Sequence, residues 1–155
     1  MDGPSHLTRN VAVGGQPTLE DLRLLQARGF VAVVNLRDDG EADQPLPPQA
    51  EGAAVQVLGL RYHHIPVVLA ELDPGRLCQL RTAIGAASGP VFVHCGAGQR
   101  ACAMALLATS EGMPVPVDDL LARAAALGFP VRDPKLASFV SEQIERERQR
   151  VLQAI

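Results

Sequence analysis

The residues best suited to covalent chemistry lie at positions 94–100, where the sequence reads His-Cys-Gly-Ala-Gly-Gln-Arg. A short apolar run before them predicts a buried strand, and the Ala- and Leu-rich stretch 101–109 predicts a helix. A glycine-containing loop between a strand and a helix directs backbone N–H groups and the positive end of the helix dipole toward one point. Cys95 at that point is favoured as the nucleophilic thiolate, and Arg100 can bind two oxygens of a tetrahedral anion. The pattern therefore predicts a site for covalent phosphate transfer.

Each of these residues has a simpler interpretation when it is taken alone. A cysteine after a strand is usually a small buried hydrophobic residue, and an arginine in a first helical turn is usually a solvated surface residue. Gly96 and Gly98 alone indicate only a turn. The combination within so few positions, with His94 directly before the cysteine, favours function.

The spacing His94-Cys95-x-x-Gly98-x-Arg100 resembles the signature loop of cysteine-dependent protein tyrosine and dual-specificity phosphatases. Most of those enzymes have five residues between the cysteine and the arginine, whereas this loop has four. The shorter spacing is similar to that of a bacterial group of non-classical phosphatase-like domains, which are also found fused to metallo-β-lactamase-type hydrolases. Upstream stretches at 15–22, 29–41 and 62–67 support this resemblance, which runs from about residue 7 to about residue 112.

The resemblance implies a hydrolase that forms a thiophosphate on Cys95 without a metal ion or other cofactor. Arg100 and the loop amides would bind the phosphate group of the substrate, and also inorganic phosphate or sulfate. His94 would support the loop from behind. The phosphate-binding residues would be Cys95, Gly96, Ala97, Gly98, Gln99 and Arg100. The substrate would be a phosphorylated protein or a small phosphomonoester. Ala101 departs from the family pattern, because many of these phosphatases have Ser or Thr there.

The general acid that protonates the leaving oxygen is the least determined residue. The families place an aspartate a few residues after the proline that matches Pro66, but apolar residues follow it here. Glu71 is the nearest carboxyl group in that loop, and Asp73 has a competing role as a helix N-cap. We expect the acid to be Glu71 before Asp73, with the acidic loop 38–41 as a further source.

Three other interpretations of the loop stay open at this point. Rhodanese-type sulfurtransferases have a six-residue active loop that begins with Cys, so Cys95 could carry a persulfide. The chain could also be a catalytically weak module that binds phosphate or a phosphoprotein. Cys102 could resolve an oxidised Cys95, although a helical cysteine is more often packing.

The order of elements predicts a single α/β domain over residues 1–155, with a mainly parallel four- to five-stranded sheet flanked by helices, as in cysteine phosphatases. Residues 7–15 are expected to form one strand, and helices are expected to begin at Leu19, Pro48, Pro74, Val117 and Pro134. The expected buried positions include Leu19, Leu22 and Leu25 in the first helix, Ala53, Ala54, Val57 and Leu58 in the second, and Cys78 in the third.

Composition excludes several classes of protein. A formal charge of −3 with 47% hydrophobic residues indicates neither nucleic acid nor an acidic membrane as a partner. No apolar run is long enough to cross a membrane, and the first six residues lack the features of a signal peptide. Three cysteines without framework spacing favour a reducing compartment, so a cytoplasmic location is expected. No His/Cys cluster has zinc-site spacing, and no feature indicates an oligomeric state.

Overall fold

The computed structural model describes residues 3–154 and is built around a five-stranded sheet of order β1-β2-β5-β3-β4. The strands are β1 (Ser5–Thr8), β2 (Val11–Gly14), β3 (Ala32–Asn35), β4 (Arg61–His64) and β5 (Val91–His94). β1 runs antiparallel to β2, and the other pairs are parallel. The expected mainly parallel α/β sheet is confirmed. The expectation of one strand over residues 7–15 is wrong, because the chain turns at positions 9 and 10 and forms a hairpin.

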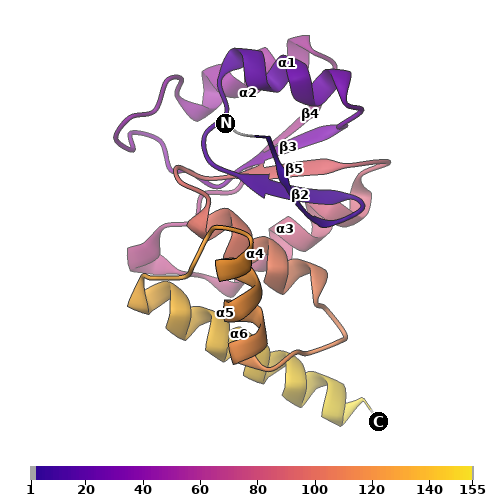
Figure 1. Cartoon of the computed structure of the whole chain (residues 1–155), viewed down its shortest axis with the longest axis vertical. Helices are drawn as coiled ribbons and strands as arrows, with labels where there is room; N and C mark the ends of the chain where they lie inside the picture. Colours follow the sequence, from indigo (N-terminus) through magenta and orange to yellow (C-terminus); the bar gives the residue numbers. More distant parts are fainter. Residues whose placement is uncertain (1–2, 155) are drawn as a thin grey trace.

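Two layers of helices cover the sheet (Figure 1). Helices α1 (Leu19–Ala27) and α2 (Pro48–Val57) lie on one face. On the other face lie α3 (Pro74–Ala86), α4 (Gln99–Thr109), α5 (Val117–Ala126) and α6 (Pro134–Gln153). A single 3₁₀ turn, η1 (Leu69–Glu71), precedes α3. Thr18 and Asp21 form a capping box at α1, and Asp73 and Asp133 cap α3 and α6 ahead of proline.

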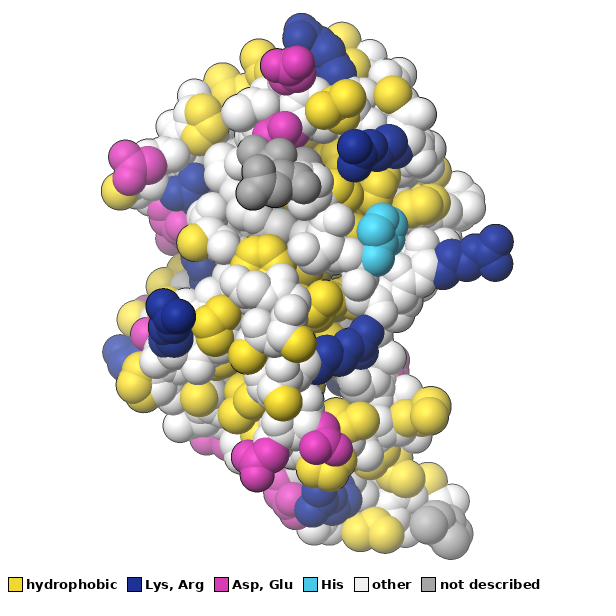
Figure 2. Space-filling view, in the orientation of Figure 1, with side chains coloured by type: hydrophobic (Ala, Val, Ile, Leu, Met, Phe, Trp, Pro, Cys, Tyr) yellow, Lys and Arg dark blue, Asp and Glu magenta, His cyan; other side chains and the backbone are white. Residues whose placement is uncertain are grey.

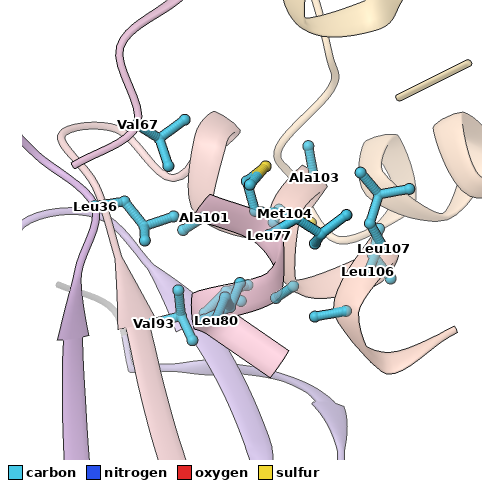
Figure 3. Packing of buried hydrophobic residues seen from close by; sticks show 14 of the residues in the cluster. Leu36, Val67, Leu77, Leu80, Val93, Ala101, Ala103, Met104, Leu106 and Leu107 are labelled. Carbon is cyan, nitrogen blue, oxygen red and sulfur yellow. The ribbon is translucent and has the colours of Figure 1, made fainter. Parts of the chain in front are cut away.

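The central strand β5 shows how the sheet divides the core. Val91 and Val93 belong to the cluster beneath α3–α6, whereas Phe92 belongs to the cluster beneath α1 and α2. This alternation is the period of two that a strand buried on both faces requires. Helix α4 packs against the first of these faces and is itself buried from Ala101 through Ala108. Figure 3 shows several of its side chains, among them Met104 and Leu106, together with cluster residues of neighbouring elements such as Val93. The site at the end of β5 is therefore held between two dense apolar layers.

Some buried positions differ from the expectation. In α2 the buried residues are Pro48, Glu51, Gly52 and Val55, whereas Val57 is 87% exposed. The expected face of α2 (Ala53, Ala54, Val57 and Leu58) is wrong at Ala53 and Val57, which are exposed, whereas Ala54 and Leu58 are half-buried and Leu58 packs against the core cluster. The buried face is centred instead on the Glu51 carboxylate and on Gly52, which lies close to the Tyr62 ring. In α1, Leu22 and Leu25 are buried as expected, but Leu19 is exposed. Cys78 is exposed on α3 and is not a core residue.

Candidate active site

The loop from Cys95 to Gly98 leaves the carboxyl end of β5, between the ends of β2 and β3. Ligands bind at this edge of parallel α/β sheets because loops from neighbouring strands converge there. Gly15, directly after β2, approaches the loop so closely that a Cβ atom there would lie 2.8 Å from the Gly96 carbonyl oxygen. Glycine at position 15 is thus required by this contact with the loop.

The loop carbonyl groups point away from the sulfur of Cys95. The carbonyl of Cys95 accepts a hydrogen bond from His94 Nδ1 at 3.2 Å, and that of Gly96 accepts one from the Gln16 N–H at 2.9 Å. The carbonyl of Gly98 accepts from Cys102 in α4. In a trans peptide the next N–H points opposite to the carbonyl, so these amides face the other way, toward the side of the loop that carries the sulfur. Within residues 3–154, the amides of Gly96, Ala97, Gln99 and Arg100 have no acceptor.

Two further amides contact the sulfur of Cys95 itself. Cys95 is only 1% exposed, and its Sγ accepts hydrogen bonds from the N–H groups of Gly98 at 3.1 Å and Ala101 at 3.4 Å. Both donors belong to the beginning of α4, where the helix dipole contributes positive charge. This environment stabilises a negatively charged sulfur. We call this set of backbone amides, from residues 96–101, the cradle.

The guanidinium of Arg100 is fixed beside the cradle by Glu41. Its two terminal nitrogens donate to the two carboxylate oxygens of Glu41 at 2.8 Å each, and Nη1 also donates to the Val67 carbonyl at 2.9 Å. The pKa of Arg100 is raised, mainly by Glu41 and against its burial, and the nearby thiol of Cys95 contributes to the increase. The Arg100 guanidinium lies close to the loop, because a Cβ atom at Gly96 would be 3.8 Å from its Nη2.

Glu41 lies in the acidic loop that follows β3. Burial alone would raise the pKa of Glu41, but hydrogen bonds from Arg100, from the Asp38 amide and from Arg37 lower it to about 2. Arg37 is itself buried and also binds the side chain of Gln16 and the Ala42 carbonyl. Both oxygens of the Glu41 carboxylate are thus occupied by hydrogen bonds from Arg100, Arg37 and the Asp38 amide, which disfavours Glu41 as the general acid. Figure 2 shows acidic side chains over this protruding loop, at the upper left.

His94 supports the loop from behind through a buried ion pair. His94 is fully buried, and its Nε2 lies 2.8 Å from a carboxylate oxygen of Glu51, which is 1% exposed. Both ring nitrogens lie within hydrogen-bond distance of an oxygen, Nε2 of Glu51 and Nδ1 of the Cys95 carbonyl. Burial raises the pKa of Glu51, but His94 and Gln16 outweigh this effect and lower it. The His94 ring is therefore held between the Glu51 carboxylate and the Cys95 peptide.

The two candidate acids lie on the loop between β4 and α3. Asp73 Oδ1 accepts the Gly75 N–H at 2.9 Å and so acts as the N-cap of α3. Glu71 ends the turn η1, is exposed, and follows closely on Val67, whose carbonyl binds Arg100. The Asp73 carboxylate is occupied by its cap, whereas the Glu71 carboxylate makes no hydrogen bond to the rest of the described chain.

Two predicted residues face away from the cradle. The side chain of Gln99 accepts hydrogen bonds from Arg132 and Asp133 in the segment before α6, so only its backbone amide can face an anion. Cys102 is fully buried in α4, and burial raises the pKa of its thiol to about 11. In residues 3–154, no group of three or more His, Cys, Asp or Glu side chains is arranged to hold a metal ion. No helix of this part of the chain has the length and apolar character that a membrane crossing needs.

The sequence interpretation did not identify Glu51, Gln16 and Phe129 as parts of the site. Glu51 lies on a helix whose hydropathy gave no sign that a carboxylate would be buried. Gln16 stood within a stretch that carried the resemblance, which was a usable signal. Phe129 lies 31 positions after Gly98 in the sequence, and its contact with the loop follows only from the fold.

The sheet order and the cysteine–arginine loop define a phosphatase-like α/β domain. The active form of Tk-PTP has the same fold, with a TM-score of 0.78 at 18% identity, and the match covers 94% of this chain and 98% of that one. A cysteine-to-serine variant of P. aeruginosa TpbA, in complex with pTyr, matches with a TM-score of 0.72 at 15% identity, over 96% of this chain and 90% of TpbA.

Residues 5–113 match the family described as "Beta-lactamase hydrolase-like protein, phosphatase-like domain", and the chain belongs to this family. The predicted resemblance is thereby confirmed, and it supports the class of phosphoric monoester hydrolases. Beta-lactamase hydrolase-like proteins of Xylella fastidiosa and Agrobacterium fabrum are 30% and 31% identical over 79% and 65% of the chain. The chain spans only 28% and 23% of their length.

Proposed function

We propose that this chain is a cysteine-dependent phosphomonoester hydrolase whose nucleophile is Cys95. The observation that carries the proposal is convergence on one point. The sulfur accepts two amide hydrogen bonds, four loop amides have no acceptor in the described chain, and Arg100 is fixed beside them. A phosphoryl group placed there would have its oxygens in the cradle and its phosphorus next to the sulfur.

The proposed reaction has two steps. The Cys95 thiolate attacks phosphorus, the bond from phosphorus to the leaving oxygen breaks, and that oxygen takes a proton from Glu71. A cysteinyl-phosphate results, with its three oxygens bound by the loop amides and Arg100. Water then attacks phosphorus and passes a proton to the Glu71 carboxylate, the S–P bond breaks, inorganic phosphate leaves and Cys95 returns to the thiolate. Ala101 offers no hydroxyl to assist the second step, so we expect hydrolysis of the intermediate to limit turnover.

We propose a phosphorylated protein or a small phosphomonoester as the substrate and the cytoplasm as the location. The complex of TpbA with pTyr supports a phosphomonoester substrate, because that protein has the same fold and binds an aryl phosphate. The buried pair of His94 and Glu51 behind the loop also fits a role in holding the thiolate rather than in contacting substrate.

The test is hydrolysis of p-nitrophenyl phosphate by the wild type, Cys95→Ser and Cys78→Ser. Cys78 is an exposed cysteine on α3, so its variant controls for thiol loss alone. We expect Cys95→Ser to abolish turnover and Cys78→Ser to retain it, with phosphate trapped on Cys95 after acid quenching of the wild type. Full turnover by Cys95→Ser would overturn the nucleophile assignment. Sulfur transfer from thiosulfate to cyanide would instead identify a rhodanese. Phosphate binding without turnover would identify a binding module.

A further inference from the structure

The connection between α5 and α6 presses on the outer side of the cysteine loop. We call residues 128–133 the outer brace. Gly98 has a φ of 100°, and a Cβ atom at this position would lie 2.3 Å from Cε1 of Phe129. The next residue, Gln99, is held by its side-chain oxygen, which accepts the N–H groups of Arg132 at 2.7 Å and Asp133 at 2.9 Å. Two consecutive loop residues are thus fixed from outside by one segment.

The outer brace is anchored at both of its ends. Its first part is tied to α5 by the hydrogen bond from the Phe129 N–H to the Ala124 carbonyl, and the Phe129 ring packs on the main core cluster. Its last residue, Asp133, caps α6 by accepting from Lys135 and Leu136. A segment held by two helices can transmit their rigidity to the loop that it contacts.

The residues that the outer brace contacts are those that orient the cradle. Gly98 donates to the Cys95 sulfur, and the peptide between Gly98 and Gln99 contributes one amide without an acceptor to the cradle. Arg100 follows directly. A small rotation at Gly98 or Gln99 would therefore redirect several donors at once, and preorganised donors act only if they are held in place.

We propose that Phe129 and the Gln99 side chain are positioning residues that fix the direction of the cradle amides. The proposal rests on the phosphatase function proposed above. The outer brace lies beyond residues 5–113, the part of the chain that matches the family, so this support comes from outside the matched region. It also assigns the Gln99 side chain a role that is distinct from phosphate binding.

The test compares Phe129→Ala, Phe129→Leu and Gln99→Ala with Phe30→Leu. Phe30 is a buried phenylalanine at the opposite end of the strands, in the cluster beneath α1 and α2, so its variant controls for a general loss of core packing. The first readout is amide hydrogen exchange at Gly98 and Ala101, whose N–H groups donate to the Cys95 sulfur. We expect faster exchange in Phe129→Ala and Gln99→Ala, partial recovery in Phe129→Leu, and wild-type exchange in Phe30→Leu.

The second readout is hydrolysis of p-nitrophenyl phosphate with inhibition by inorganic phosphate. We expect kcat/KM to fall at least about tenfold in Phe129→Ala and the inhibition constant of phosphate to rise, because loss of one preorganised donor costs about 10²–10³ in rate. Unchanged exchange in Phe129→Ala, or an equal change in Phe30→Leu, would overturn the proposal. A wild type without turnover would refute the proposed function, and the exchange data would still decide the role of the outer brace.

Discussion

Replacing Glu51 by Gln should destabilise the protein strongly although the side chain keeps its size. Glu51 and His94 are both almost fully buried and lie 2.8 Å apart. Breaking a buried ion pair by removing one partner costs about 3–5 kcal/mol. Gln can still accept the hydrogen bond from His94, so we expect the lower end of this range, about 3 kcal/mol. For a chain of this size that corresponds to a fall in Tm of about 6–12 °C.

The pH dependence gives this prediction a sharper form. Burial acts to raise the pKa of Glu51, but the hydrogen bond and charge of His94 outweigh it and lower the pKa from its ordinary value of 4.5. A carboxyl group with a lowered folded pKa stabilises the fold fully above its unfolded pKa, and this contribution is lost as the pH falls through the folded pKa. The stability difference between the wild type and Glu51→Gln should therefore be largest near pH 7 and shrink progressively below about pH 4.5.

Urea denaturation at about pH 7 and about pH 3 measures both quantities, with Glu142→Gln on the exposed part of α6 as the control. We expect the control to stay within about 0.5 kcal/mol of the wild type at both pH values. A Glu51→Gln variant as stable as the wild type at neutral pH, or a difference that does not change with pH, would refute the buried ion pair as the support of the loop.

Three further outcomes are expected at the cradle. Glu41→Gln should lower kcat/KM for p-nitrophenyl phosphate by about tenfold to a hundredfold, because Arg100 loses a charge-assisted pair; an unchanged value would show that Val67 alone can hold Arg100. Gly98→Ala should lower both activity and Tm, since its φ of 100° and the Phe129 ring leave no room for a side chain; wild-type melting would contradict this. Glu71→Gln should slow hydrolysis of an alkyl phosphate more than that of p-nitrophenyl phosphate, whose leaving group needs little protonation; equal effects on the two substrates would remove Glu71 as the acid.

Local signals in the sequence predicted most of the fold. The strand β5 and the helices that begin with Asp-Pro or Pro were predicted because their turn and cap residues stand next to the apolar runs that they delimit. The hairpin of β1 and β2 was missed because its turn, Arg9-Asn10, lacks glycine and proline. The buried face of α2 was missed because its burial is decided by a distant ion-pair partner, and hydropathy assigns a glutamate to the surface.

The candidate site likewise has a part that the sequence predicted and a part that it did not. Cys95, Arg100 and the loop amides lie within six positions, so their spacing alone indicated a common role. The residues that hold them come from separate segments: Gln16, Glu41, Glu51, Val67 and Phe129. Each of these contacts is a product of tertiary structure, for which residue type and spacing give no direct signal.

This dispersal of the supporting residues has a consequence for folding. Contacts between segments far apart in sequence form only when the loops between them have closed. The contacts of the outer brace with Gly98 and Gln99 therefore form only once α5 and α6 have docked. A fragment that ends after α4 would contain Cys95, Arg100 and the proposed acid Glu71, but it would lack the outer brace that contacts Gly98. Recovery of activity during refolding should thus not precede the docking of α5 and α6, which makes this loop an internal reporter of that docking.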